Sequence, residues 1–291
     1  MICNLCPRRC NALRTKTENQ NGFCKMPLLP KVARASLHFW EEPIISGEKG
    51  SGTVFFSGCS LNCVYCQNFD VSHNGLGKTI TAERLAEIFK ELEEKGAHNI
   101  NLVTPTHYIH AIIEALKIYK PKIPVVYNSS GYDLPEALKK LAGLADIFLL
   151  DFKYITPERA ALYSGASNYP EIVKSAIIEA VRQCPENIIE NGIMKKGVII
   201  RHLLLPRATN EAIAIFDWVR ENANGSYFSL MSQYLPYGKA LDMPIINRKI
   251  TKREYEKVIN YILDTNYQNV FIQDMKSADL KYIPKFDFSG V

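Results

Sequence analysis

Three cysteines with short, uneven spacing are the residues of this chain best suited to metal chemistry. Cys59, Cys63 and Cys66 form a C-x3-C-x2-C pattern. Three thiolates on one loop suit three irons of a [4Fe–4S] cube and leave the fourth iron without a protein ligand, unlike four-cysteine electron-transfer clusters. An open site on a metal centre commonly binds a substrate or cofactor. The alternative is a zinc loop completed by a distant His or Cys, although zinc loops usually pair thiols as C-x2-C.

Four more cysteines stand near the start of the chain. Cys3, Cys6, Cys10 and Cys24 are spaced as C-x2-C-x3-C-x13-C. Four thiolates complete either a tetrahedral zinc site or a fully ligated cluster. A zinc ion would help this short segment to fold, whereas a second [4Fe–4S] cluster would relay electrons to the first. The sequence leaves both readings open, with disulfides as a third.

Composition limits the compartment and the partners. Of the 8 cysteines in 291 residues, 7 lie before residue 67, and 35 basic against 30 acidic side chains give a mild charge of +5. No block of like charges and no apolar run near the ~18 residues of a membrane span is present, so we expect neither nucleic acid nor membrane as a partner. The opening residues lack the basic and apolar stretch of a secretory signal. We therefore expect a cytoplasmic protein, where clustered thiols more often bind metal than form disulfides.

The elements that must position these cysteines follow from hydrophobic periodicity. Beyond residue 50, short apolar runs alternate with segments of helical period, as in 81–95, where the apolar residues are spaced i, i+3, i+4, i+7. We expect strands at 53–56, 100–103, 125–127, 147–150, 198–203, 227–231 and 270–272. We expect helices at 81–95, 108–119, 135–141, 157–184, 212–222 and 252–264.

Strands separated by helices at this spacing predict an α/β fold with a parallel sheet. About six βα repeats fit a partial (β/α)6 barrel, similar to a TIM barrel, better than a short doubly wound sheet. The active site is then expected at the C-terminal ends of the strands. The first residues lack this rhythm, so we predict a Cys-rich metal-binding module at 1–45 and a partial-barrel domain at 46–291.

The position of the cysteine triplet after the first barrel strand resembles the radical S-adenosylmethionine (SAM) superfamily. More narrowly, the segments HFWEEP (38–43), SGTVFF (51–56) and CQN (66–68) are similar to the pyruvate formate-lyase activating enzyme-related family. This resemblance implies an enzyme with a [4Fe–4S] cluster whose open iron binds SAM. One electron then cleaves SAM to methionine and a 5′-deoxyadenosyl radical, which takes a hydrogen atom from the substrate. A reductant such as flavodoxin or ferredoxin is the partner that the resemblance implies.

The resemblance also implies contacts to SAM. Tyr65, before the third cysteine, would lie against the adenine. Asp151 and Lys153 alternate on one strand and so point to one face, where they need each other or a zwitterionic ligand. The family pattern D-x-K at this strand contacts the methionine end of SAM. Arg201, on the next strand, suits a carboxylate bidentately and is carried over as a SAM ligand.

Three turns depart from the activating enzymes. Those enzymes have a GGEP-like turn after the second strand, where this chain has Thr104 in VTPTH. They have an Asp-Thr-Asn-Gly turn after the third strand, where this chain has Ser130 in NSSG. We expect Thr104 and Ser130 to contact SAM nonetheless, but the cation site that the lost aspartate helps to form is in doubt. The histidine expected after Leu-Pro-Tyr is replaced by Gly238.

These features predict a radical SAM oxidoreductase whose substrate is a glycine in a partner enzyme. A second hypothesis keeps the radical chemistry and gives it a small molecule or another protein side chain. A third is a non-catalytic metal-binding interaction protein on the same scaffold.

Overall fold

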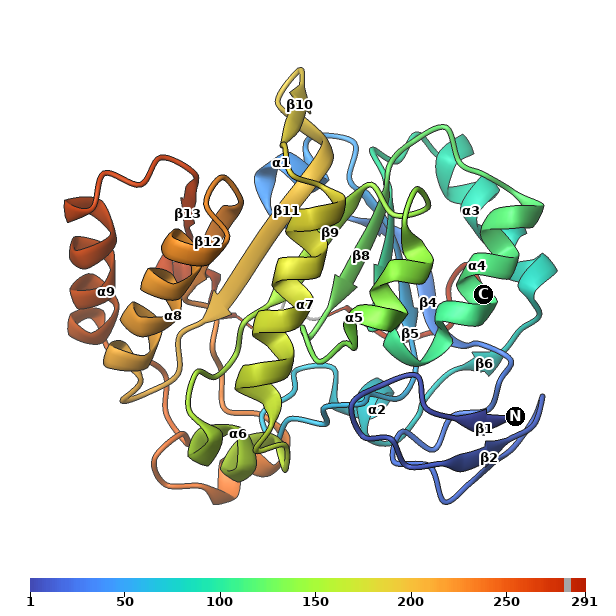
Figure 1. Ribbon diagram of the computed structural model, residues 1–291, viewed down its shortest axis with the longest axis horizontal. Helices are drawn as coiled ribbons and strands as arrows, with labels where there is room; N and C mark the ends of the chain where they lie inside the picture. Colours follow the sequence, from blue (N-terminus) through green and yellow to red (C-terminus); the bar gives the residue numbers. More distant parts are fainter. Residues whose placement is uncertain (280–283) are drawn as a thin grey trace.

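The central sheet is made of apolar strands, most of whose residues are buried. In the computed structural model, which describes residues 1–279 and 284–291, the barrel strands run parallel and pair in chain order (Figure 1). They are β5 (Ser51–Phe56), β7 (Ile100–Val103), β8 (Val125–Ser129), β9 (Ile147–Asp151), β11 (Ile193–Leu203), β12 (Tyr227–Met231) and β13 (Val270–Ile272). The sheet does not close, because β13 ends it on one side and β4 with β6 on the other. The predicted α/β partial barrel is confirmed.

Helices connect the parallel strands and pack against the outer face of the sheet (Figure 1). They are α3 (Ala82–Glu94), α4 (Ile109–Ile118), α5 (Pro135–Leu138), α6 (Pro157–Ser164), α7 (Tyr169–Gln183), α8 (Thr209–Asn222) and α9 (Lys252–Asp264). Single turns of 3-10 helix lie at η1 (Thr106–Tyr108), η2 (Lys139–Leu141), η3 (Gly238–Asp242) and η4 (Met275–Ser277). The short helix α2 (Phe69–Ser72) follows the cysteine triplet.

One region that was predicted as a single helix is two helices in the structure. The region 157–184 is two helices, α6 and α7, because Gly165 caps α6 in the left-handed conformation with φ +56°. Glycine takes this conformation without the steric cost that a Cβ brings. The strand predicted at 198–203 is longer than expected, since β11 begins at Ile193 and forms a hairpin with β10 (Ile188–Glu190).

The N-terminal segment contributes to two sheets. Strands β1 (Ile2–Cys3), β2 (Ala12–Arg14) and β3 (Asn19–Gln20) form a small antiparallel sheet of their own. Strand β4 (Lys31–His38) instead pairs antiparallel with β5 and with β6 (Lys78–Thr79), at the edge of the central sheet. The strand pairing therefore crosses the predicted domain boundary at residue 45, and the division into two domains stays a prediction.

A short helix lies on the inner side of the curved sheet. This helix, α1 (Pro43–Ser46), contacts β11, and its fully buried Ile45 packs against apolar side chains of β8, β9 and β11. The Asn99 side chain donates to the Ile45 carbonyl at 2.8 Å. The segment before α1 is therefore held at the bottom of the barrel interior, where its side chains reach the strands.

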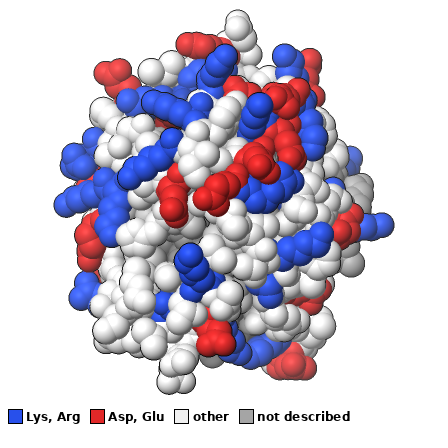
Figure 2. Space-filling model, turned by 90° about the vertical axis from the view of Figure 1, so that its right-hand side faces the viewer, with Lys and Arg blue, Asp and Glu red and all other residues white. Residues whose placement is uncertain are grey.

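Basic and acidic side chains are interspersed on the face drawn in Figure 2, without a broad area of one sign. This agrees with the mild net charge of +5. In the described part of the chain, no helix combines the length and the apolar character that crossing a membrane requires.

Candidate functional site

The C-terminal ends of the parallel strands meet around one cavity of about 740 Å³. The three clustered cysteines and every predicted SAM contact line it: Cys59, Cys63, Cys66, Tyr65, Thr104, Ser130, Asp151, Lys153 and Arg201. The four N-terminal cysteines are not part of its wall. The structure therefore brings the predicted residues together, while their roles stay predictions.

The cysteine loop begins two residues after β5 and is shaped by a glycine. Gly58 has φ +79°, and a Cβ there would lie 2.3 Å from Cγ of Met26 in the N-terminal segment. The backbone N–H groups of Leu61 and Asn62 then point at the Cys59 sulfur, with N–S distances of 3.3 and 3.5 Å. Such donors stabilise a thiolate more than a thiol.

The other two sulfurs accept hydrogen bonds from hydroxyl groups. Ser164 Oγ donates to Cys63 Sγ at 3.1 Å, and Ser72 Oγ donates to Cys66 Sγ at 3.3 Å. Burial raises the pKa of Cys59 to about 12 and also raises the pKa of Cys66. Without a metal, Cys59 and Cys66 are therefore protonated at neutral pH, and a metal must displace these protons to bind them.

The donor set around the cavity consists of three thiols and fits a cluster bound by thiolates. Among residues 1–279 and 284–291, no three His, Cys, Asp or Glu side chains form a group that could hold one metal ion. Three thiols on one cavity wall, each with a hydrogen-bond donor at its sulfur, fit a larger group held by three thiolate bonds.

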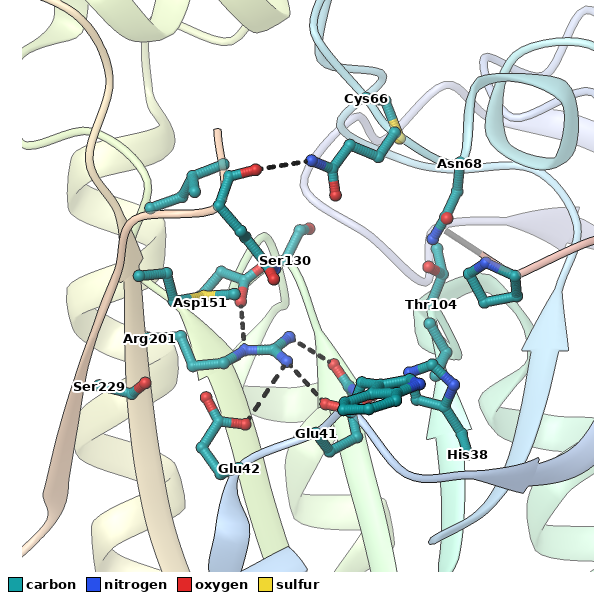
Figure 3. A pocket seen from close by; sticks show the side chains of 18 of the residues that line it. His38, Glu41, Glu42, Cys66, Asn68, Thr104, Ser130, Asp151, Arg201 and Ser229 are labelled. Carbon is teal, nitrogen blue, oxygen red and sulfur yellow. Dashed lines mark hydrogen bonds and ion pairs between the residues drawn. The ribbon is translucent and has the colours of Figure 1, made fainter. Parts of the chain in front are cut away.

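A largely buried guanidinium organises the opposite part of the cavity. Arg201 donates through Nε to Asp151 at 2.8 Å and through its two terminal nitrogens to Glu41 at 3.0 Å and Asn128 at 2.7 Å. Glu42 lies 4.0 Å away. Figure 3 shows these acids gathered around Arg201. One side chain therefore joins β8, β9, β11 and the segment before α1.

The charges of this cluster shift one another's pKa values. Burial alone would raise the pKa of Asp151, but Arg201 and Lys153, whose Nζ lies 2.7 Å from Asp151 Oδ2, outweigh it and keep that pKa below its usual value. For Glu41 and Glu42, burial prevails over the attraction of Arg201 and raises the pKa. Of the three acids around Arg201, Asp151 therefore has the strongest preference for the ionised form.

The sequence reasoning missed Glu41, Glu42 and Asn128 as members of the site. The two acids lie in the segment 38–43 that carries the family resemblance, but no periodicity indicates where their side chains point. Only the docking of α1 inside the sheet aims them at Arg201. A pair of acids directly before a buried apolar helix was the available signal.

Tyr65 is deeply packed. Its ring is 5% exposed and meets the rings of Tyr154 and Tyr234 edge-on at centroid distances of 6.4 and 5.8 Å. Its hydroxyl accepts a hydrogen bond from Tyr154 Oη at 2.7 Å. The packing fixes the orientation of this ring in the cavity wall.

Two turns that depart from the activating enzymes lie side by side. Thr104 has φ +60°, the conformation that glycine favours, and its N–H donates to the Asn128 carbonyl at 2.9 Å. After Ser130, Gly131 has φ +72°, and a Cβ there would lie 2.4 Å from the Asp151 carbonyl oxygen. The close approach of these turns sets the cavity wall beside Asp151.

The four N-terminal cysteines lie close to one another. Burial raises the pKa of the Cys6 thiol to about 12, and Cys24, Cys3 and Cys10 lie near enough for a negative charge on any of them to raise it further. Arg14, 1% exposed, donates to Cys3 Sγ at 3.5 Å.

The remaining partners of Arg14 are uncharged. It donates to the carbonyls of His107, at 2.8 Å, and Pro27. Within the described residues, no carboxylate forms an ion pair with it. A buried cation without a counter-charge is costly, so a negatively charged group bound in this segment would stabilise Arg14.

Comparison with known proteins identifies the family. The family model described as the Radical SAM superfamily matches residues 53–219. This chain belongs to the radical SAM superfamily. An uncharacterized protein of Methanocaldococcus jannaschii is 32% identical over 91% of this chain and 76% of its own length. A pyruvate formate-lyase-activating enzyme of Clostridium pasteurianum is 26% identical over 57% of this radical SAM chain and 67% of its own length.

Solved structures of low identity share the fold. SuiB of Streptococcus suis bound to S-adenosylmethionine aligns with a TM-score of 0.54 at 15% identity, over 75% of this chain and 48% of that protein. Methylornithine synthase aligns with a TM-score of 0.51 at 15% identity, over 74% of this chain and 61% of its own. This radical SAM chain thus spans about half the length of SuiB.

We predict that Arg201→Met lowers the free energy of unfolding by about 3 kcal/mol, because it leaves buried carboxylates without their cation. Loss of Arg201 raises the already raised pKa values of Glu41 and Glu42 further. An acid whose pKa is raised in the folded protein stabilises the fold when it is protonated. This stabilisation is lost as the pH rises through the raised pKa. The deficit against wild type should therefore grow from about pH 5 to about pH 8 in urea unfolding experiments.

The control is Arg220→Met, which removes a partly exposed i,i+3 pair with Asp217 at 3.5 Å. This substitution should lower the free energy of unfolding by well under about 1 kcal/mol, and the difference from wild type should not change with pH. An Arg201→Met deficit that stays constant with pH would contradict the charge balance described for this cavity.

Proposed function

We propose that this chain is a radical SAM enzyme in which Cys59, Cys63 and Cys66 hold a [4Fe–4S] cluster and SAM occupies the adjoining cavity. The observation that carries the proposal is the meeting of three thiols, each with a donor at its sulfur, and a largely buried Asp–Lys–Arg set on one cavity. Membership of the radical SAM superfamily supports it.

The cavity wall offers both charges that the methionine end of SAM requires. Lys153 donates to Asp151, and this pair presents an ammonium and a carboxylate side by side. We propose that they bind the carboxylate and amino groups of SAM. Arg201 already donates to three groups, so its contact with SAM would replace one of its present acid partners.

The remaining predicted contacts have fixed positions. We propose that the Tyr65 ring, locked among other tyrosines, lies against the adenine, and that the turns at Thr104 and Ser130 border the methionine moiety. When bound, the reduced cluster and SAM supply a 5′-deoxyadenosyl radical that abstracts hydrogen. The buried packing of Tyr65, Tyr154 and Tyr234 keeps water from this side of the cavity.

We propose that the hydrogen comes from a glycine of a partner enzyme, as the similarity to pyruvate formate-lyase-activating enzymes supports. A second candidate is a small molecule. It is favoured by similarity to a 7-carboxy-7-deazaguanine synthase of Methanothermobacter thermautotrophicus, 26% identical over 50% of this chain and 55% of its own length. The lost aspartate and histidine of the activating-enzyme turns favour this candidate too. In either case a flavodoxin or ferredoxin is the proposed reductant.

We predict that Cys59→Ala, Cys63→Ala and Cys66→Ala each abolish reductive cleavage of SAM, since each removes one of three cluster ligands. The assay is 5′-deoxyadenosine formation by the anaerobically reconstituted, dithionite-reduced protein. Cys184→Ala is the matched control, because Cys184 is also buried but donates to the Asp146 carbonyl away from the cavity. Turnover retained in any of the three variants, or absent from wild type, would contradict the proposal.

We further propose that Cys3, Cys6, Cys10 and Cys24 hold a second [4Fe–4S] cluster. Two observations support a metal–thiolate site here: the mutual proximity of the thiols and the buried Arg14 that lacks a carboxylate. Gly58, next to the first cysteine of the triplet, packs closely against the Cys24 carbonyl and Met26. A cluster here would therefore be placed to relay electrons.

Metal analysis tests this second site. In the variant with Cys59, Cys63 and Cys66 all replaced by Ala, we expect about four irons per chain after reconstitution. Adding Arg14→Gln should lower iron retention, because the thiolates lose their buried counter-charge. About one zinc per chain with little iron would overturn the second cluster, and unaltered iron in the Arg14→Gln background would overturn the role given to Arg14.

A further inference from the structure

Arg8 belongs to the N-terminal cysteine segment, yet its side chain binds the backbone of the cysteine triplet. Its Nε donates to the Ser60 carbonyl at 2.9 Å, and a terminal nitrogen donates to the Leu61 carbonyl at 3.2 Å. Both acceptors lie between Cys59 and Cys63. The guanidinium therefore holds the part of the loop whose N–H groups point at the Cys59 sulfur.

The same guanidinium also holds the end of α6. Its terminal nitrogens donate to the carbonyls of Ser164 at 2.8 Å and Gly165 at 2.5 Å. The Ser164 hydroxyl is the group that donates to the Cys63 sulfur. Through four carbonyls, Arg8 thus fixes two of the groups that surround the thiols of the triplet. A planar five-donor fork can do this, whereas a lysine ammonium cannot reach all four.

The N-terminal segment holds Arg8 from its other side. The Arg8 guanidinium stacks over the Phe23 ring at 3.9 Å, and Phe23 directly precedes Cys24. The N–H of Arg9 donates to the Cys6 carbonyl at 3.0 Å, which closes a turn that contains Arg8. Arg8 therefore lies within the turn that begins at Cys6 and stacks on the ring next to Cys24.

We propose that Arg8 is a positioning residue that couples metal occupancy of the N-terminal four-cysteine site to the readiness of the Cys59–Cys66 loop for its cluster. With the N-terminal thiolates bound to metal, the turn is fixed and the guanidinium holds the loop closed. Without that metal, the loop loses its anchor although none of its own ligands has changed. The inference rests on the proposed function, since it assigns a cluster to the triplet.

The test compares wild type with Arg8→Ala, Arg8→Lys and Arg9→Ala. Arg9 is the matched control, because it is adjacent but its pair with Glu136, at 3.4 Å, is exposed. Two readouts are used: the SAM-responsive part of the electron paramagnetic resonance (EPR) spectrum of the reduced protein, and hydrogen exchange of the backbone amides at 59–66 in metal-free and reconstituted protein.

We expect Arg8→Ala to lose most of the SAM-responsive signal and to exchange faster at 59–66, while keeping its N-terminal metal. Arg8→Lys should recover part of both, and Arg9→Ala should match wild type. Cys6→Ser should produce the same two losses, and the double variant Cys6→Ser with Arg8→Ala should add little to either, because both act through one contact. A full SAM-responsive signal with protected amides in Arg8→Ala or Cys6→Ser would overturn the coupling.

Two controls separate the failures. If wild type shows no SAM-responsive signal at all, the proposed function fails, and the hydrogen-exchange comparison still decides whether Arg8 anchors the loop. If Arg8→Ala does not fold, as judged by its thermal transition, Arg8→Lys and Cys6→Ser carry the test. Equal exchange at 59–66 in wild type and in both of these variants would overturn the proposal.

Discussion

The largely buried guanidinium of Arg201 is the constraint on which the cavity depends. A charge held inside a barrel must find anionic partners, and here Asp151 comes from β9 while Glu41 comes from the segment before α1. The ion pairs and hydrogen bonds of Arg201 hold the segment before α1 inside the sheet and align the ends of β8, β9 and β11. It also keeps Asp151 ionised beside Lys153, so that two opposite charges face the space next to the cysteine triplet.

Two arginine side chains of the N-terminal segment also need polar partners. Arg14 is buried among carbonyls and a cysteine sulfur, and Arg8 spans from the same segment to the triplet loop. Both cations belong to a segment that has little apolar core of its own, as expected for a short module that metal helps to fold. The small sheet and the barrel are therefore linked by specific hydrogen bonds as well as by apolar packing.

Most of the fold could be predicted, because periodicity directly reports the alternation of buried strands and amphipathic helices. The strand Tyr227–Met231 and the helix Lys252–Asp264 have the predicted bounds. Features set by tertiary contact could not be predicted in this way. Glu41 and Glu42 acquire their place from the docking of Ile45, and β4 joins the central sheet only through its pairing with β5 and β6. The break at Gly165 had a local signal, a glycine within a helical pattern, which the long apolar period obscured.

The central claim is that the Cys59–Cys66 loop holds a cluster with an iron open to SAM. The most direct measurement is the EPR spectrum of the anaerobically reduced, reconstituted protein, recorded with and without SAM. The account predicts a reduced-cluster signal whose shape changes when SAM is added, because SAM binds the iron that lacks a protein ligand. A reduced-cluster signal that SAM leaves unchanged would contradict it.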